Sequence, residues 1–360
     1  MKTVKVGIIG SGYIADTHLR AFQLVPEAEV VAIASPTAEH VQAMADQYGV
    51  PQWFTDYHKL LALDEIDMVT LCLPNDLHAQ ACIDAAQAGK HVVCEKPMCL
   101  TLAEADRMIQ ACRDAGVKLM YAEELCFAPK YVRAKQLVDQ GALGKVFRVK
   151  QSEEHSGPHS PWFWDVKRSG GGVLLDMGCH SIAFCRWIYG RQPIKRVYAQ
   201  MGTHVHGDKT RGEDHSVALL EFADGGIGIC ENSWAKGGGV DDIAEIYGSL
   251  GHTRADLLHG SALLTYSEAG YDYAVEKAAT TTGWSFTMFE ELWNYGFPQE
   301  MAHFARCVAD DAQPLVTGED GRQVLEVIYA LYESARRGAA VDLPFTPSDE
   351  AKTPIEQWLR

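Results

Sequence analysis

Short apolar runs alternate with amphipathic segments along the first third of the chain. Runs of this length, bounded by polar and glycine-rich stretches, are typical of strands buried on both faces of a sheet. The predicted strands are residues 4–9, 29–34, 67–73, 91–94 and 117–121. The segments between them have helical periodicity. Repeated strand–helix units predict an α/β fold with a doubly wound parallel sheet.

After residue 124 the pattern changes to longer strands with few helices between them. Strands are expected at residues 145–152, 194–200, 217–222, 227–234, 244–247 and 253–256. This succession predicts an α+β domain with a large, open, mostly antiparallel sheet. We therefore expect a first domain over residues 1–124, a second over residues 125–343, and a surface tail over residues 344–360.

The length, charge and cysteine usage narrow the class of protein. The chain has 360 residues, more than one ordinary core requires. Its net charge of -16 disfavours nucleic acids and anionic membrane surfaces as partners. The ten cysteines are scattered, several within apolar runs, which is typical of free thiols in the reducing cytoplasm. No C-x-x-C motif or paired Cys/His spacing is present, so we expect no metal site.

A glycine-rich turn follows the first predicted strand and opens a helix. The segment Gly10-Ser11-Gly12-Tyr13-Ile14-Ala15 has the G-x-G-x-x-A form of a dinucleotide fingerprint. Gly10 permits a tight turn, Gly12 lets the backbone approach a pyrophosphate, and Ala15 allows close packing of helix on strand. The helix N-terminus offers N–H donors to the phosphates. The alternative is a glycine-rich turn that binds nothing.

The second strand ends without the acidic residue that binds a free ribose 2′-hydroxyl in many NAD-binding proteins. It ends in Ala34-Ser35-Pro36-Thr37, with neither a carboxylate to repel a 2′-phosphate nor an arginine to bind one. The sequence therefore leaves NAD and NADP both open. Ser35 and Thr37 are candidates to bind either ribose, or they cap the next helix.

Two further polar segments follow predicted strands, at the edge where an open α/β sheet binds its ligands. Pro74-Asn75-Asp76-Leu77-His78 follows one strand and Glu95-Lys96-Pro97 follows another. Asn75 and His78 are candidates to contact the dinucleotide; the alternative is a capping Asn75 beside an exposed His78. We interpret Lys96 as held there to meet a substrate, with a structural ion pair to Glu95 as the alternative.

A second cluster of chemically capable residues lies in the later part of the chain. Three glycines precede a predicted helix in which Asp176 and His180 are spaced i and i+4 and so share one face. The rest of that face is apolar, which predicts an inward-facing polar site, or else a core Asp–His hydrogen bond without chemistry. A histidine accepts a hydroxyl proton near neutral pH, and an aspartate orients it.

Residues 155–165 are rich in histidine and tryptophan. Indole rings suit the C–H faces of a pyranose, and imidazoles suit its hydroxyls. The candidate substrate contacts here are His155, His159, Trp162 and Trp164. The alternative is an aromatic plug that packs for buried area alone.

Five motifs, taken in order, resemble the Gfo/Idh/MocA oxidoreductase family, named for glucose-fructose oxidoreductase and inositol dehydrogenase. They are GIIGSGYIADTH, PNDLH, EKP, GGGVLLDMGCH and GEDGRQVLEVIYALYESA. The resemblance covers nearly the whole chain. It implies a Rossmann domain followed by an α/β domain whose open sheet builds homodimers or homotetramers. It also implies that Lys96, Asp176 and His180 form the catalytic set.

From the fingerprint and the resemblance together, we expect dinucleotide contacts from Gly10, Gly12, Tyr13, Ile14, Ser35, Thr37, Pro74, Asn75, His78, Glu95 and Lys96. One departure concerns the stretch that reads A-E-N-x-R-F-x-P in many family members. Here it is AEELCFAP, so Glu124 replaces an amide and Cys126 replaces an arginine. A carboxylate at position 124 is a candidate to bind a pair of sugar hydroxyls.

The expected function is NAD(P)-dependent oxidation of a secondary hydroxyl on a sugar, sugar derivative or cyclitol, or reduction of the corresponding ketone. His180 acts as general base, and Lys96 stabilises the developing alkoxide. One alternative is a lyase or glycosidase that holds and recycles its NAD through transient oxidation of a hydroxyl. A second alternative is a non-catalytic sensor that binds a dinucleotide.

Overall fold

The computed structural model describes residues 3–259, 263–268, 280, 282–287, 290–348 and 350–360. The chain divides into two compact units. The first comprises Met1–Glu124 and Gly296–Gln323, and the second comprises Leu125–Tyr295 and Val324–Arg360. The first unit is thus built from two separate stretches of chain, whereas the domains expected from the sequence are continuous.

The first unit contains a six-stranded sheet in the order β3-β2-β1-β4-β5-β6, in which all neighbouring strands are parallel. Its strands are β1 (Val4–Ile9), β2 (Ala28–Ala34), β3 (Gln52–Phe54), β4 (Met68–Leu71), β5 (His91–Cys94) and β6 (Leu119–Tyr121). Its helices are α1 (Tyr13–Phe22), α2 (Ala38–Tyr48), α3 (Tyr57–Leu61), α4 (Asn75–Gln87), α5 (Leu102–Asp114) and α11 (Phe297–Ala309). The doubly wound parallel sheet predicted from the sequence is confirmed.

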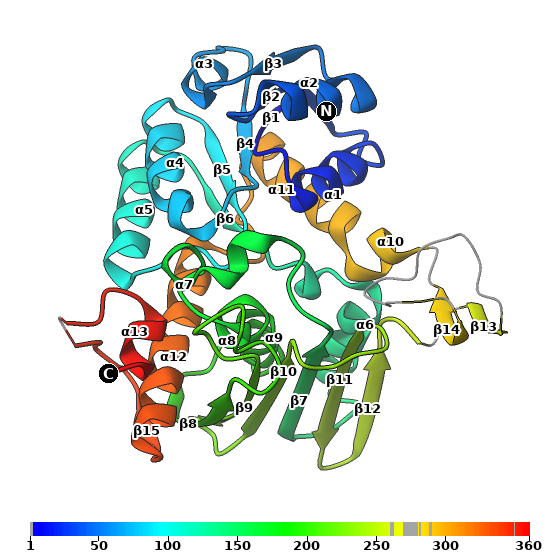
Figure 1. The fold of residues 1–360 in the computed structure, drawn as a ribbon, viewed down its shortest axis with the longest axis vertical. Coiled ribbons are helices and arrows are strands. Elements are labelled where there is room, and N and C mark those ends of the chain that lie inside the picture. The colour runs from blue at the N-terminus through cyan, green and yellow to red at the C-terminus, as the bar shows by residue number, and fades with distance from the viewer. Residues whose placement is uncertain (1–2, 260–262, 269–279, 281, 288–289, 349) are drawn as a thin grey trace. The chain divides into compact units, whose positions relative to one another are not determined.

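Local sequence signals explain several of these elements. Every residue of β4 is buried, as expected for a strand covered on both faces. Helix α5 begins with a capping box, because the Thr101 side chain accepts from the Glu104 N–H and the Glu104 carboxylate accepts from the Thr101 N–H. Helix α11, late in the sequence, packs against α1 and β1 (Figure 1).

The second unit contains a seven-stranded sheet in the order β12-β11-β7-β10-β9-β8-β15. Its strands are β7 (Val146–Glu154), β8 (Ile194–Gly202), β9 (His215–Phe222), β10 (Ile227–Ser233), β11 (Asp241–Gly248), β12 (Gly251–Asp256) and β15 (Val341–Asp342). Only β7 and β10 pair in parallel, so the mostly antiparallel sheet predicted from the sequence is confirmed. A separate antiparallel pair joins β13 (Leu263–Ser267) and β14 (Gly283–Thr287).

The helices of this unit are α6 (Pro129–Asp139), α7 (Val166–Ser169), α8 (Val173–Asp176), α9 (Gly178–Ile188), α10 (Glu291–Tyr295), α13 (Pro354–Trp358) and the 3-10 turn η2 (Pro161–Trp164). Helix α12 (Gly318–Arg337) begins in the first unit and ends in the second. Helix α9 is buried along its whole length and packs against β7 and β10. The opposite face of the sheet is more exposed, since burial alternates along β9.

A buried polar chain links α9 to the sheet. Ser181 of α9 donates to the Gln151 side chain of β7 and accepts from Asn232 of β10. Gln151 in turn donates to Asp242 of β11, which also accepts from the Tyr131 hydroxyl of α6. Burial and the charge of Glu153 raise the pKa of Asp242 well above its ordinary value. Asp242 therefore sits within a network that connects two helices through the sheet.

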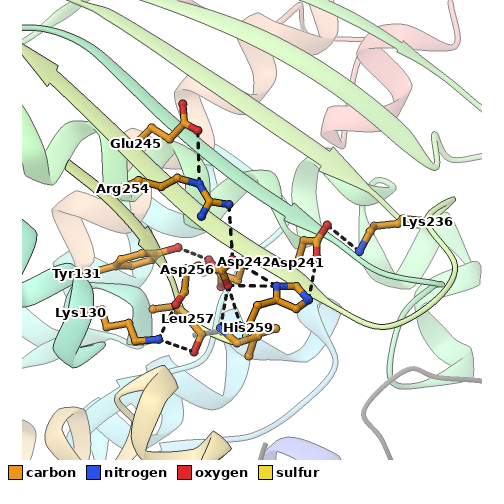
Figure 2. A network of polar contacts seen from close by, with 11 residues as sticks. Lys130, Tyr131, Lys236, Asp241, Asp242, Glu245, Arg254, Asp256, Leu257 and His259 are labelled. Atoms are coloured by element: carbon orange, nitrogen blue, oxygen red, sulfur yellow. Dashed lines mark hydrogen bonds and ion pairs between the residues drawn. The ribbon is translucent and has the colours of Figure 1, made fainter. Parts of the chain in front are cut away.

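The edge of this sheet is fastened to α6 by charged contacts (Figure 2). Lys130 donates to the carbonyl oxygens of Asp256 and Leu257, at the end of β12. His259 lies between the carboxylates of Asp256 and Asp241, with nitrogen–oxygen distances of 3.2 and 3.5 Å. These contacts hold the edge strand β12, none of whose residues is buried.

The last residues of the chain, expected as a surface tail, contain the short helix α13. Its Ile355 is buried and donates its N–H to the Gly170 carbonyl at 3.0 Å. The Gln357 amide donates to Glu333 of α12. The tail is therefore anchored within the second unit. Among the residues that the structure describes, no helix is both long and apolar enough to cross a membrane.

Candidate active site

The two fingerprint glycines are required for different reasons. Gly10 has a φ of +126°, and a Cβ there would lie 2.0 Å from the Cys72 carbonyl oxygen. The fold itself therefore demands glycine at this position. Gly12, by contrast, has ordinary extended backbone angles, and a Cβ there would meet no atom of the described residues within 4 Å. Protein packing does not explain Gly12, whereas a ligand lying against the backbone does.

Polar groups from β2 lie beside the glycine-rich turn. The Ser11 hydroxyl donates to the Ser35 hydroxyl at 2.6 Å, which ties the turn to the end of β2. Thr37 precedes α2, but its side chain makes no capping hydrogen bond, so the capping alternative is not seen there. Tyr13 is exposed and Ile14 is half-buried at the start of α1.

The segment after β4 departs from the capping interpretation. Pro74 occupies the cap position, and Asn75 is the buried first residue of α4. His78, whose alternative was an exposed side chain, is fully buried; that alternative is wrong. Its Nδ1 lies 3.0 Å from the Pro97 carbonyl oxygen and its Nε2 lies 2.9 Å from that of Leu73. Burial lowers the pKa of His78, while the hydrogen bonds to the two carbonyls raise it. The ring ties α4 to the segment after β5.

Glu95 and Lys96 follow β5, and the peptide bond between Lys96 and Pro97 is cis. One Glu95 oxygen accepts the Lys96 N–H at 3.0 Å, and the other lies 2.8 Å from Nε2 of His18 on α1. Burial raises the pKa of Glu95, but the hydrogen bond and charge of His18, with the charge of Lys96, lower it below its ordinary value. Glu95 therefore carries its negative charge inside the first unit.

The helix expected to carry both Asp176 and His180 is interrupted. Asp176 is the last residue of α8, and His180 lies in the first turn of α9, with Met177 between the two helices. The two residues therefore belong to two short helices, although Met177 between them keeps helical backbone angles. Both side chains are buried. Sequence periodicity did not reveal this break, since each short helix keeps helical spacing.

Glu213 braces the start of α8, and the sequence interpretation missed it. One of its carboxylate oxygens accepts the Leu174 N–H at 2.9 Å and the Tyr332 hydroxyl at 2.8 Å. A Cβ on Gly172 would lie 2.0 Å from the Glu213 carbonyl oxygen, which explains one glycine of the triplet. Burial raises the pKa of Glu213 from 4.5 to about 7.

The aromatic segment packs largely against the protein itself. The Trp164 ring lies 5.3 Å from that of Trp234 and 5.0 Å from that of His206. Trp164 and Phe163 pack against the buried cluster of Val173, Met177 and Trp234. This geometry favours the plug interpretation for Trp164.

The other candidate substrate contacts differ in exposure. Trp162 is half-buried and stacks on Phe163 at 3.8 Å. His155 is buried and His159 is exposed, with ring centroids 5.8 Å apart. Their roles toward substrate stay predictions. Glu124, which begins the 3-10 turn Glu124–Cys126, is also buried.

The first unit has the features that a dinucleotide requires. In the strand order, β1 is followed on one side by β2 and on the other by β4, so the order reverses between β1 and β4. Open α/β sheets bind ligands outside the carboxyl ends of the strands at such a reversal. The open position at Gly12 lies at the N-terminus of α1, where backbone N–H groups suit a pyrophosphate.

Comparison with known proteins agrees with this arrangement. Residues 4–123 match the model of the oxidoreductase family with an NAD-binding Rossmann fold, and residues 131–254 match the GFO/IDH/MocA C-terminal domain. Similar curated proteins include myo-inositol 2-dehydrogenase of Thermotoga maritima, 29% identical over 94% of this chain and 98% of that protein. They also include D-xylose 1-dehydrogenase (NADP(+)) 2 of Haloferax volcanii, 32% identical over 94% of this chain and 99% of that protein.

Among solved structures, GenD2 from gentamicin A biosynthesis, in complex with NAD, matches with a TM-score of 0.90 and 29% identity. That match covers 96% of this chain and 97% of the other. The scyllo-inositol dehydrogenase of Lactobacillus casei, with bound NAD(H) and scyllo-inositol, matches with a TM-score of 0.80 and 26% identity over 95% and 99% of the two chains. The chain therefore belongs to the Gfo/Idh/MocA oxidoreductase family and is an NAD(P)-dependent dehydrogenase.

Proposed function

We propose that the enzyme oxidises a secondary hydroxyl of a sugar, sugar derivative or cyclitol, or reduces the corresponding ketone. The observation that supports the redox part most directly is the open glycine position at Gly12, beside the reversal in strand order. The substrate class rests on the relatives, which are named as inositol and xylose dehydrogenases. Their shared chemistry is the oxidation of one carbinol in a polyhydroxylated ring.

The proposed roles follow from the chemistry of three side chains. The nicotinamide ring, when the dinucleotide is bound, supplies the acceptor for the carbinol hydride. An imidazole nitrogen of His180 accepts the hydroxyl proton, and the Lys96 ammonium stabilises the negative charge that develops on the oxygen. Asp176 orients His180 or accepts a hydrogen bond from a neighbouring substrate hydroxyl.

The dinucleotide contacts are proposed to come from the glycine-rich turn and the carboxyl ends of the neighbouring strands. Gly12 and the N-terminus of α1 would hold the pyrophosphate, and Ser35 or Thr37 would bind a ribose hydroxyl. Substrate hydroxyls would be bound by Glu124 and His159, with Trp162 offering a ring face. His155 would complete the substrate contacts, with Trp164 packed beside Trp234. The other dinucleotide contacts would come from Tyr13, Ile14, Pro74, Asn75, His78 and Glu95.

The test is a panel of myo-inositol, scyllo-inositol and D-xylose, each with NAD and NADP, followed at the absorbance of the reduced nicotinamide. Steady accumulation of reduced nucleotide is expected with at least one member. His180→Asn should lower kcat/KM by about 10²–10⁴-fold, and Lys96→Ala should lower kcat by about 10²–10³-fold. Lys59→Ala, which removes an exposed lysine of α3, is the matched control and should leave kcat unchanged. Full activity in both site variants would refute the proposed roles.

We further propose that two copies pair through the open face of the seven-stranded sheet. Leu219 is 42% exposed on that face and lies opposite Ile229 of β10 and Tyr198 of β8. A contiguous apolar patch on a sheet is typical of an interface between subunits. Leu219→Lys should shift the mass measured by light scattering towards the monomer.

All ten cysteines are free thiols, which supports a cytoplasmic location.

A further inference from the structure

A buried histidine connects the first helix to the segment that carries Lys96. His18 lies on α1 and is fully buried. Its Nε2 is 2.8 Å from a Glu95 oxygen, and its Nδ1 is 2.9 Å from the Thr70 hydroxyl at the end of β4. The other Glu95 oxygen accepts the Lys96 N–H. A continuous hydrogen-bonded chain therefore runs from β4 through α1 to the backbone of Lys96.

The contacts of His18 favour its protonated form. Burial lowers the pKa of His18, but the contacts with Cys72 and Glu95 outweigh burial and hold that pKa well above its ordinary value. With both ring nitrogens protonated, Nε2 donates to Glu95 and Nδ1 donates to Thr70. Thr70 is then free to donate to the Cys72 sulfur, which is 3.1 Å away. Each hydrogen bond in the chain has one donor and one acceptor.

A further titratable group near His18 and Glu95 is Glu300, which comes from α11 and lies far from both in sequence. Glu300 is fully buried, and neither of its carboxylate oxygens has a hydrogen-bond partner among the described residues. Burial and the negative charges of Glu124 and Glu95 hold the pKa of Glu300 well above its ordinary value. This shift favours the protonated acid, which places no second negative charge opposite His18.

The groups around His18 come from several elements. They are Glu95 and Lys96 after β5, Thr70 and Cys72 at β4, Glu123 and Glu124 after β6, and Phe297 and Glu300 on α11. The His18 ring lies within hydrogen-bond distance of the Glu95 carboxylate. Removing it would leave a buried carboxylate without its cation, which a fold tolerates poorly.

We propose that His18 is a positioning residue for Lys96. It keeps Glu95 ionised and fixed in orientation. Glu95 then holds the Lys96 N–H and so fixes the backbone from which the ammonium projects. Glu300 supports the arrangement by keeping its proton. This inference rests on the proposed role of Lys96, and neither His18 nor Glu300 is expected to touch the substrate.

The test compares the steady-state kinetics of His18→Gln with those of Thr17→Ala, using the polyol from the panel above that gives the highest kcat. A displaced catalytic group loses about 100-fold in rate, so His18→Gln should lower kcat by about that factor while KM for the polyol changes little. Thr17 neighbours His18 on α1 and is also buried, but in the described part of the chain its hydroxyl bonds only within the helix, to the Tyr13 carbonyl. Thr17→Ala should therefore keep the wild-type kcat.

The pH profile separates positioning from general damage to the fold. In His18→Gln the pKa of Glu95 loses the effect of its cation and rises. The kcat of this variant should therefore fall, as pH decreases, at a higher pH than the kcat of the wild type. Glu300→Gln mimics the protonated acid and should keep the wild-type profile. A profile of His18→Gln that parallels the wild type, or a shifted profile for Glu300→Gln, would overturn the inference.

Two further variants keep the proposal testable if His18→Gln does not fold. Thr70→Val removes the acceptor of Nδ1 while keeping the side-chain shape, and it should shift the acid limb in the same direction with a smaller loss of kcat. The double variant Glu95→Gln with Thr70→Val should lower kcat no more than Glu95→Gln alone, because both residues act through the same chain of hydrogen bonds. Additive losses would contradict the proposal. If Lys96→Ala itself keeps full kcat, the proposed function fails instead.

Discussion

Replacing Glu213 with glutamine is expected to abolish the loss of stability that the ionisation of Glu213 causes between acidic and weakly basic pH. Glu213 is buried at the start of α8, where one oxygen accepts from both Leu174 and Tyr332. The other oxygen has no hydrogen-bond partner among the described residues. Ionisation therefore places a charge in an environment that satisfies only half of the carboxylate.

The size and direction of the effect follow from the pKa. Burial raises the pKa of Glu213 from 4.5 to about 7, so the native state keeps a proton that the unfolded chain releases above pH 4.5. The free energy of unfolding therefore falls as pH rises from about 4.5 to about 7, and the loss is complete above the native pKa. At about 1.4 kcal/mol per pKa unit, the total loss is about 3 kcal/mol.

Glutamine keeps an acceptor oxygen for Leu174 and Tyr332 but does not ionise. The difference in free energy of unfolding, Glu213→Gln minus wild type, should therefore rise by about 2.5 kcal/mol between pH 5 and pH 8, because part of the total loss has already occurred at pH 5. A buried amide that lacks an acceptor costs about 1–3 kcal/mol, but this term does not depend on pH. Urea unfolding followed by far-ultraviolet circular dichroism at several pH values measures the slope.

Glu333→Gln is the matched control in the same unit. The hydrogen bonds from Arg336, Gln357 and Arg337 outweigh burial and lower the pKa of Glu333 to about 2. The stability that this group contributes is present above pH 4.5 and is lost only as pH falls towards its native pKa. Glu333→Gln should therefore differ from wild type by a constant amount between pH 5 and pH 8. Parallel curves for Glu213→Gln and wild type over that range would refute the reasoning.

Three further predictions concern the first unit. Thr101→Ala should lower the free energy of unfolding by about 1 kcal/mol in urea titrations, because it removes the cap of α5. Gly12→Ala should leave the melting temperature unchanged but weaken NAD binding measured by calorimetry, whereas Gly10→Ala should destabilise the fold because its Cβ would clash with the Cys72 carbonyl. Ser35→Asp should raise the preference for NAD over NADP by at least about tenfold, or 1.4 kcal/mol; an unchanged ratio of kcat/KM values would show that the 2′ group lies elsewhere.

Local sequence patterns were sufficient for most of the secondary structure and for both sheet types. Apolar runs and glycine breaks predict the strands of the first unit, and the capping box at Thr101 marks the start of α5. The glycine fingerprint likewise depends on only six consecutive residues. These features are readable because each is set by backbone geometry and by neighbours a few residues away.

The pairing of buried charges was decided by tertiary structure. Glu300 joins the first unit although it lies in the last fifth of the chain, and Glu213 reaches α8 from the strand region. His18 is one of fourteen histidines, and its contact with Glu95 crosses 77 positions in sequence. The break at Met177 separates Asp176 from His180 without any change in helical spacing. Burial and electrostatic contacts depend on three-dimensional neighbours, so the pattern that predicts a helix does not specify which charge its buried face will meet.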